Sequence, residues 1–212
     1  PTNIDKRTQR KTVKLSNGTL RLALLPKESR GERVQTVIQL QFGNAETLKG
    51  QRIASIATPD LLLSGTEQLT RQQIKDRIDA LGGQVSVSGS GTTVNISAST
   101  TRANIDPLVR FVLDVVRQAS FPQIEVDEYR GTVLTSIKSS MTEPTAIASR
   151  MLARHDNPWP KDDIRYQPSF EESIAAVTEL NREMLVSFHN NFYGTSQVAA
   201  AAVGSFDPTL ME

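Results

Sequence analysis

Cysteine is absent from this 212-residue chain, and its absence excludes several kinds of site at once. Without a thiol the protein can form no disulfide bond, no zinc site with thiolate ligands and no cysteine nucleophile. Histidine is almost as scarce, because His155 and His189 are the only two in the sequence. A metal centre ligated by imidazole would therefore have to use one or both of these positions.

The chain also lacks a strong net charge and a long hydrophobic run. Its 24 basic and 23 acidic residues give a formal net charge of +1, so the overall charge favours neither a nucleic acid nor an anionic membrane as a partner. No apolar run approaches the ~20 residues that a membrane-spanning helix requires. The first ten residues are polar rather than signal-like, and an initiator methionine is missing. We therefore expect a processed or excised piece of a longer protein, from which a leader could have been lost.

The remaining composition, 38% hydrophobic and 22% charged, is that of an ordinary globular domain. Alternating apolar and polar residues predict β-strands at 12–15, 19–25, 34–42, 85–88, 93–101 and 197–203. The dipeptide Asn17-Gly18 predicts a tight turn between the first two strands, because both residues tolerate a positive φ. Helical periodicity and capping residues predict helices at 48–63, 70–81, 105–118, 124–140, 144–154, 170–176 and 178–192.

Runs of strands separated by runs of helices are typical of the α+β class. We therefore predict one mostly antiparallel sheet of five to six strands with helices packed on one face. No internal segment has the composition of a linker, so residues 12–207 are interpreted as a single module. Residues 1–11 are predicted to be a polar linker, and 208–212 the start of a linker to a following module.

Several short motifs in this order resemble one module of the insulinase/pitrilysin (inverted zincin) family of zinc peptidases. They are Leu15-Ser16-Asn17-Gly18, Gly65-Thr66, Leu81-Gly82-Gly83, Phe121-Pro122 and Asn191-Phe192-Tyr193-Gly194. The resemblance covers nearly the whole chain and implies a fold like that of LuxS and the processing peptidases. The chain most resembles the first module of the non-catalytic second half of bacterial two-half enzymes.

The family's metal motif, His-x-x-Glu-His, precedes a Gly-Thr pair, and the resemblance places it here on Ile56-Ala57-Thr58-Pro59-Asp60. Both histidines and the general-base glutamate are therefore missing. The third ligand, a glutamate of a later helix, aligns with Thr135-Ser136. A catalytic zinc needs three protein ligands and an open position. We therefore predict no catalytic, cofactor-binding or metal-binding residue in this chain, and zinc only in the parent protein.

Other candidate sites have plainer interpretations. His155, beside Asp156 and near Asp162 and Asp163, could bind a divalent ion, but a solvated loop is favoured. His189 lies near a helix end, where it is expected to cap the helix or interact with its dipole.

Three carboxylates at Glu125, Asp127 and Glu128 suit the first turn of a helix. Ser88-Gly89-Ser90-Gly91 joins two strands and lacks the form of a nucleophile elbow. The polar face formed by Thr93, Asn95, Ser97 and Ser99 would either meet water or, by the resemblance, line a substrate chamber.

The resemblance implies a non-catalytic, substrate-enclosing domain of a larger zinc endopeptidase that acts on peptides. Its partners would be other modules of the same polypeptide and, in the assembled parent, the peptide substrate. We expect neither a nucleic-acid partner nor a membrane span, and the resemblance to bacterial relatives implies a periplasmic location. The alternative is a stand-alone, inactive interaction subunit that partners an active zinc peptidase chain. An upstream half carrying His-x-x-Glu-His would favour the first hypothesis, and a gene encoding one module would favour the second.

Overall fold

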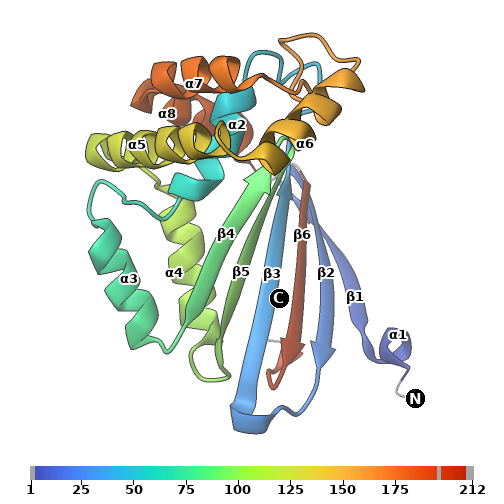
Figure 1. Cartoon of the computed structure of the whole chain (residues 1–212). Helices are drawn as coiled ribbons and strands as arrows, with labels where there is room; N and C mark the ends of the chain where they lie inside the picture. The colour runs from blue at the N-terminus through green and yellow to red at the C-terminus, as the bar shows by residue number, and fades with distance from the viewer. Residues whose placement is uncertain (1–2, 195–196, 209–212) are drawn as a thin grey trace.

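A six-stranded sheet forms one side of the molecule in the computed structural model, which describes residues 3–194 and 197–208 (Figure 1). The strands lie in the order β1-β2-β6-β3-β5-β4. Their bounds are β1 Gln9–Leu15, β2 Gly18–Pro26, β3 Arg33–Gln41, β4 Gln84–Ser90, β5 Thr93–Thr101 and β6 Gln197–Gly204. The pair β2–β6 is parallel and the other four pairs are antiparallel. The predicted α+β class and mostly antiparallel sheet are therefore confirmed.

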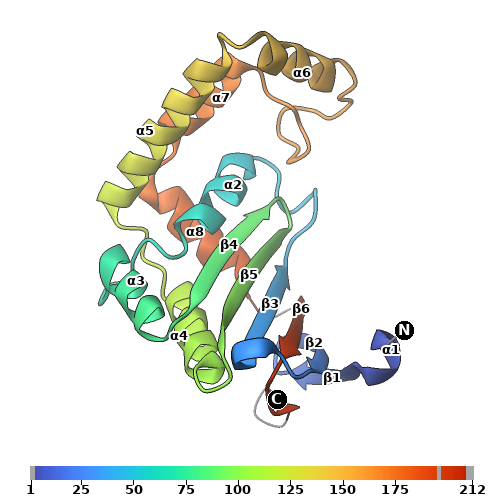
Figure 2. The same cartoon turned by 60° about the horizontal axis from the view of Figure 1, so that its bottom comes forward.

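The described residues form eight α-helices, most of which cover one face of this sheet or extend beyond its upper edge, whereas α1 lies beside the start of β1. They are α1 Ile4–Arg7, α2 Arg52–Leu61, α3 Arg71–Ala80, α4 Ile105–Arg117, α5 Gln123–Ser140, α6 Pro144–His155, α7 Phe170–Glu179 and α8 Arg182–Phe192. Figure 2 shows α5 and α7 running side by side away from the sheet towards α6, and the contacts between α5 and α7 agree. No helix of the described segments is long and apolar enough to cross a membrane.

Capping residues explain where the best-predicted helices begin. Thr70 accepts a hydrogen bond from the Gln73 amide while the Gln73 side chain accepts one from the Thr70 amide, so a capping box starts α3. Asn181 likewise accepts from the Met184 amide and starts α8. The helix predicted for 178–192 therefore begins later, at Arg182, and α7 runs on to Glu179 instead of ending at 176.

The hydrophobic core lies between the sheet and helices α2, α4 and α8. Alternate residues of the central strands face these helices, and Val94, Ile96 and Leu108 are almost completely buried. The opposite sheet face carries the residues that alternate with them, including the predicted polar set Thr93, Asn95, Ser97 and Ser99. No helix of the described chain covers that face, which is open in Figure 1.

The first hairpin forms where the sequence predicted it, but its turn differs by one residue. Gly18 begins β2 and pairs with Leu15, so Ser16 and Asn17 form the two-residue turn. None of these turn residues has a positive φ, contrary to the prediction from Asn17-Gly18. The observed pairing sets Val13 opposite Leu20, so that apolar side chains of both strands share one face.

The ends of the chain differ in part from the predicted linkers. In the described part of 1–11, residues 4–7 form α1 and residues 9–11 already pair with β2, so this segment is not a simple polar linker. The alternation of apolar and polar residues is weak before Val13, and pairing with a long neighbouring strand extends β1 all the same. Of the linker predicted for 208–212, all but Pro208 lies outside the described residues.

Candidate functional site

The site predicted from the family's metal motif lies on α2, where Ile56, Pro59 and Asp60 occupy the three diagnostic positions. Pro59 is buried inside the helix, which continues past it to Leu61. Asp60 accepts a hydrogen bond from the Tyr129 hydroxyl of α5 at 3.3 Å. Partial burial raises the pKa of Asp60, and burial together with the nearby Asp60 charge raises the pKa of Tyr129. A phenol–carboxylate pair therefore stands where the family resemblance places a metal ligand.

The third ligand position requires a correction. Thr135 and Ser136, with which the family glutamate was aligned, are exposed to solvent. The α5 side chains directed towards α2 are Tyr129, Val133 and Ile137, which recur every four residues on one helical face. A ligand at 135 or 136 would therefore point away from α2, and the α5 residue that lines the same cavity as Ile56 is Val133. Val133 is apolar, so the residues present do not fit a zinc ion.

This correction leads to a test by metal-site restoration. Replacing Ile56 and Asp60 by histidine places two imidazoles four residues apart on one face of α2, and zinc should then raise the melting temperature. Adding Val133→Glu should strengthen zinc binding by a further factor of about ten or more, because a third protein ligand completes the site. The matched change Thr135→Glu should add nothing, and isothermal titration with zinc compares the two. An equal or greater gain from Thr135→Glu would contradict the corrected alignment.

The two histidines lie in different surroundings. His189 is buried, and its Nε2 donates a hydrogen bond to the Val116 carbonyl near the end of α4, at 2.8 Å. Burial lowers the pKa of His189, while the bond to the Val116 carbonyl acts in the opposite direction. The predicted interaction with a helix end therefore exists, but the helix is α4. His155 is exposed at the end of α6, and no group of three possible metal ligands occurs in the described residues.

The acidic cluster of α5 is engaged in ion pairs. Glu125 pairs with Arg71 of α3, and Asp127 pairs with Arg130 one turn further along α5. Two of the three carboxylates are thus paired with an arginine, which is consistent with a structural role at the start of the helix. The segment Ser88-Gly89-Ser90-Gly91 spans the end of β4 and the following turn, where Gly91 has φ +60°. That position in a hairpin matches the structural interpretation made from the sequence.

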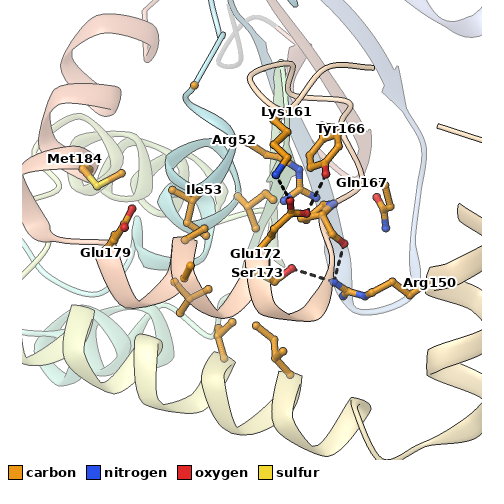
Figure 3. Close-up of a pocket in the computed structure, with 18 of the residues that line it drawn as sticks. Arg52, Ile53, Arg150, Lys161, Tyr166, Gln167, Glu172, Ser173, Glu179 and Met184 are labelled. Carbon is orange, nitrogen blue, oxygen red and sulfur yellow. Dashed lines mark hydrogen bonds and ion pairs between the residues drawn. The ribbon is translucent and has the colours of Figure 1, made fainter. Parts of the chain in front are cut away.

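A cavity of about 530 Å³ lies beside this site, between α2, α5, α7 and the segment 161–168. Apolar side chains from α2 and α5 form one wall, among them Ile53, Ile56 and Val133. Figure 3 shows Arg52, Lys161, Tyr166 and Glu172 gathered at one end, with Glu179 and Met184 towards the other. No local sequence pattern reveals this cavity, because its residues come from four segments that are far apart along the chain.

Two carboxylates fix the segment after α6: Asp163, which lies within it, and Glu172, which lies in the first turn of α7. Glu172 accepts hydrogen bonds from the Tyr166 hydroxyl at 2.9 Å and from the Ser169 amide, and it pairs with Lys161 and Arg154. Asp163, only 5% exposed, pairs with Arg165, whose guanidinium stacks on Trp159. A loop rich in proline and aspartate is therefore held in one conformation, and it closes one end of the cavity.

These two carboxylates predict a specific dependence of stability on pH. Bonds from Arg165 lower the pKa of Asp163 to about 2, and Lys161, the Ser169 amide and Arg154 lower that of Glu172. A carboxylate with a depressed folded pKa stabilises the fold above its unfolded pKa, near 4, and this contribution is lost as pH falls towards 2. Urea midpoints measured between pH 2 and 6 should therefore fall steeply below about pH 4. The double variant Asp163→Asn, Glu172→Gln should fall less steeply, and an unchanged slope would contradict the assignment.

Comparison with known proteins supports the family resemblance in two ways. Residues 59–158 match the family model of insulinase (Peptidase family M16), so the resemblance inferred from the sequence is confirmed. The whole fold resembles a peptidase M16 inactive domain from Pseudomonas fluorescens, with a TM-score of 0.76 and 14% identity over 95% of this chain. It also resembles a protease from Helicobacter pylori, with a TM-score of 0.77 and 14% identity over 95% of this chain.

This chain spans about half the length of these two solved structures, 48% of each. No curated protein matches it in sequence. At 14% identity the structural likeness shows the fold alone, so roles of individual residues must be argued from this chain's own side chains.

Proposed function

We propose that this chain is a non-catalytic module of a larger zinc peptidase of the insulinase family, with the metal site supplied by another module. The observation that carries the proposal is the set Ile56, Pro59 and Asp60 on α2, together with Val133 on α5. No side chain there is a histidine or a glutamate, and a buried proline replaces the base that would deprotonate a metal-bound water. The family match over 59–158 supports the assignment to an insulinase-type module. The missing metal ligands support the lack of catalysis.

We further propose that the module helps to enclose a peptide substrate. The open sheet face supports this role, because it offers hydroxyl and amide groups rather than carboxylates. Its described residues on β3, β4 and β5 are Arg33, Gln35, Val37, Gln39, Gln41, Gln84, Ser86, Ser88, Ser90, Thr93, Asn95, Ser97, Ser99 and Thr101. Such groups hydrogen-bond to peptide backbone of any sequence. The partners would be the other modules of the polypeptide, and a periplasmic location remains part of the same proposal.

The alternative, a separate inactive subunit beside an active peptidase chain, would use the same surfaces. One observation favours a module within a longer polypeptide: both similar solved structures continue for about as many residues again as they share with this chain. The two hypotheses differ in gene organisation rather than in chemistry.

Reading the complete open reading frame tests this choice. The proposal expects a neighbouring half with His-x-x-Glu-His and a downstream glutamate on the same polypeptide. Deleting the present module from that polypeptide should then abolish cleavage of a long unfolded peptide while the active half keeps its zinc, measured by metal analysis. Full cleavage by the truncated enzyme would overturn the enclosing role, and a gene with one module would favour the separate subunit.

A further inference from the structure

Two arginines of the α2–α5–α7 cavity, Arg52 and Arg150, are close enough for their charges to interact. Arg52 is half-buried, and its Nε is buried without a hydrogen-bond partner among the described residues. Its guanidinium makes no ion pair within the described chain, and the neighbouring charge that acts on it is that of Arg150. Partly desolvating two like charges side by side is unfavourable unless an anion joins them.

Several contacts hold the Arg150 guanidinium in one orientation, in which it can bind such an anion. One of its terminal nitrogens donates to the carbonyls of Pro168 and Ser169 and to the Ser173 hydroxyl, and its guanidinium stacks on Phe170 at 4.2 Å. These contacts fix the plane of the group, and the hydrogen bonds among them come from one of its three nitrogens, so donors remain for a ligand.

The carboxylates that line the cavity do not fill this role. Glu172 already accepts from Tyr166 and the Ser169 amide and pairs with Lys161 and Arg154. Glu179 lies towards the opposite end of the cavity in Figure 3. The positive charge of Arg52 is therefore not balanced by a neighbour within the described part of the cavity.

The rest of the cavity is apolar and of suitable size. Ile53, Ile56, Val133, Ile137 and Met184 line it. A volume of about 530 Å³ falls within the usual range of ligand pockets and accommodates a few amino-acid residues. A matching ligand therefore carries a carboxylate next to an apolar side chain.

We propose that this cavity is a binding site for a peptide carboxylate, which the guanidinium groups of Arg52 and Arg150 clamp while an adjoining apolar side chain packs on the α2 and α5 wall. The carboxylate comes either from a free peptide C-terminus or from an acidic side chain of a peptide segment. The site goes beyond the proposed enclosing role, because it recognises one chemical group and lies on the helical side of the sheet.

The test is isothermal titration of the purified chain with three N-acetylated leucine tripeptides at pH 7. The first has a free C-terminal carboxylate, the second a C-terminal amide, and the third an amide with aspartate at its middle position. At least one carboxylate-bearing peptide should bind about tenfold or more tightly than the plain amide, since a bond to a charged group contributes more than a neutral one. The first peptide would identify a C-terminus as the source, and the third a side chain.

Arg52→Gln should remove this preference while leaving the melting temperature unchanged or higher, because Arg52 makes no bond that supports the fold. Arg110→Gln is the matched control, since Arg110 is exposed on α4 and its ion pair is with Asp106 on its own helix. Added salt should weaken binding of the acids more than that of the amide. Equal binding of acids and amide, no binding of any peptide, or full binding by Arg52→Gln would overturn the proposal. None of these results would bear on the enclosing role, which the deletion of the whole module tests.

Discussion

Replacing Gly204 by alanine is expected to lower the free energy of unfolding by about 3 kcal/mol or more. Gly204 ends β6 between Pro26 of β2 and Val34 of β3, with φ at +133°. A side chain is strained in that conformation, and the added Cβ would overlap the Arg33 carbonyl and approach the Val34 Cα at 2.8 Å. Both contacts are backbone, so no rotamer change can relieve them. Urea unfolding followed by circular dichroism measures the loss.

Gly131→Ala is the matched control for this prediction. Gly131 lies exposed within α5, and a Cβ there would meet no atom within 4 Å. Alanine should therefore raise the unfolding free energy by about 0.5–1 kcal/mol, because it favours the helix. Equal stability of the two alanine variants would contradict the close backbone contact between Gly204 of β6 and the start of β3.

Replacing Phe188 by alanine is expected to cost about 3–5 kcal/mol. The Phe188 side chain, 1% exposed, lies against Phe42 at the end of β3 with ring centroids 5.9 Å apart in an edge-to-face arrangement. It also lies 4.8 Å from the Phe192 ring. Removing it would leave a cavity between α8 and the sheet, because rings on both sides are fixed by their own neighbours. The midpoint of thermal unfolding should fall by about 6–20 °C for a cost of this size.

Leu113→Ala provides the comparison, because Leu113 lies on the outer side of α4 and is 39% exposed. Its loss should change the unfolding free energy by less than about 1 kcal/mol. A Phe188→Ala variant as stable as Leu113→Ala would show that α8 does not share the central core.

The sequence predicted the elements whose signals are local. The capping threonine, apolar stripe and diglycine of 70–83 define α3 almost completely, since cap and periodicity agree within one segment. The alternation in 93–101 gave β5 its bounds for the same reason. Strand order and the parallel pairing of β2 with β6 depend on contacts between distant segments, and no local pattern encodes them.

The candidate site likewise combines features that the local sequence encodes with features that depend on contacts between distant segments. The loss of metal ligands on α2 can be read directly from Ile56, Pro59 and Asp60, because a helical motif has fixed internal spacing. The α5 residues that face α2 could not be read in this way, because the face that one helix turns towards another depends on tertiary packing. Helical phase decides it, and the Tyr129–Asp60 contact sets that phase. The clamp formed by Arg52 and Arg150 was missed because arginines far apart in sequence carry no signal of proximity.

The absence of catalytic chemistry is tested most directly by metal analysis of the purified chain after dialysis, combined with a peptide-cleavage assay on the same sample. We expect no stoichiometric zinc and no cleavage, because Asp60 alone cannot replace three protein ligands and Pro59 stands in place of the base. One tightly bound zinc per chain, or cleavage that a chelator abolishes, would contradict it.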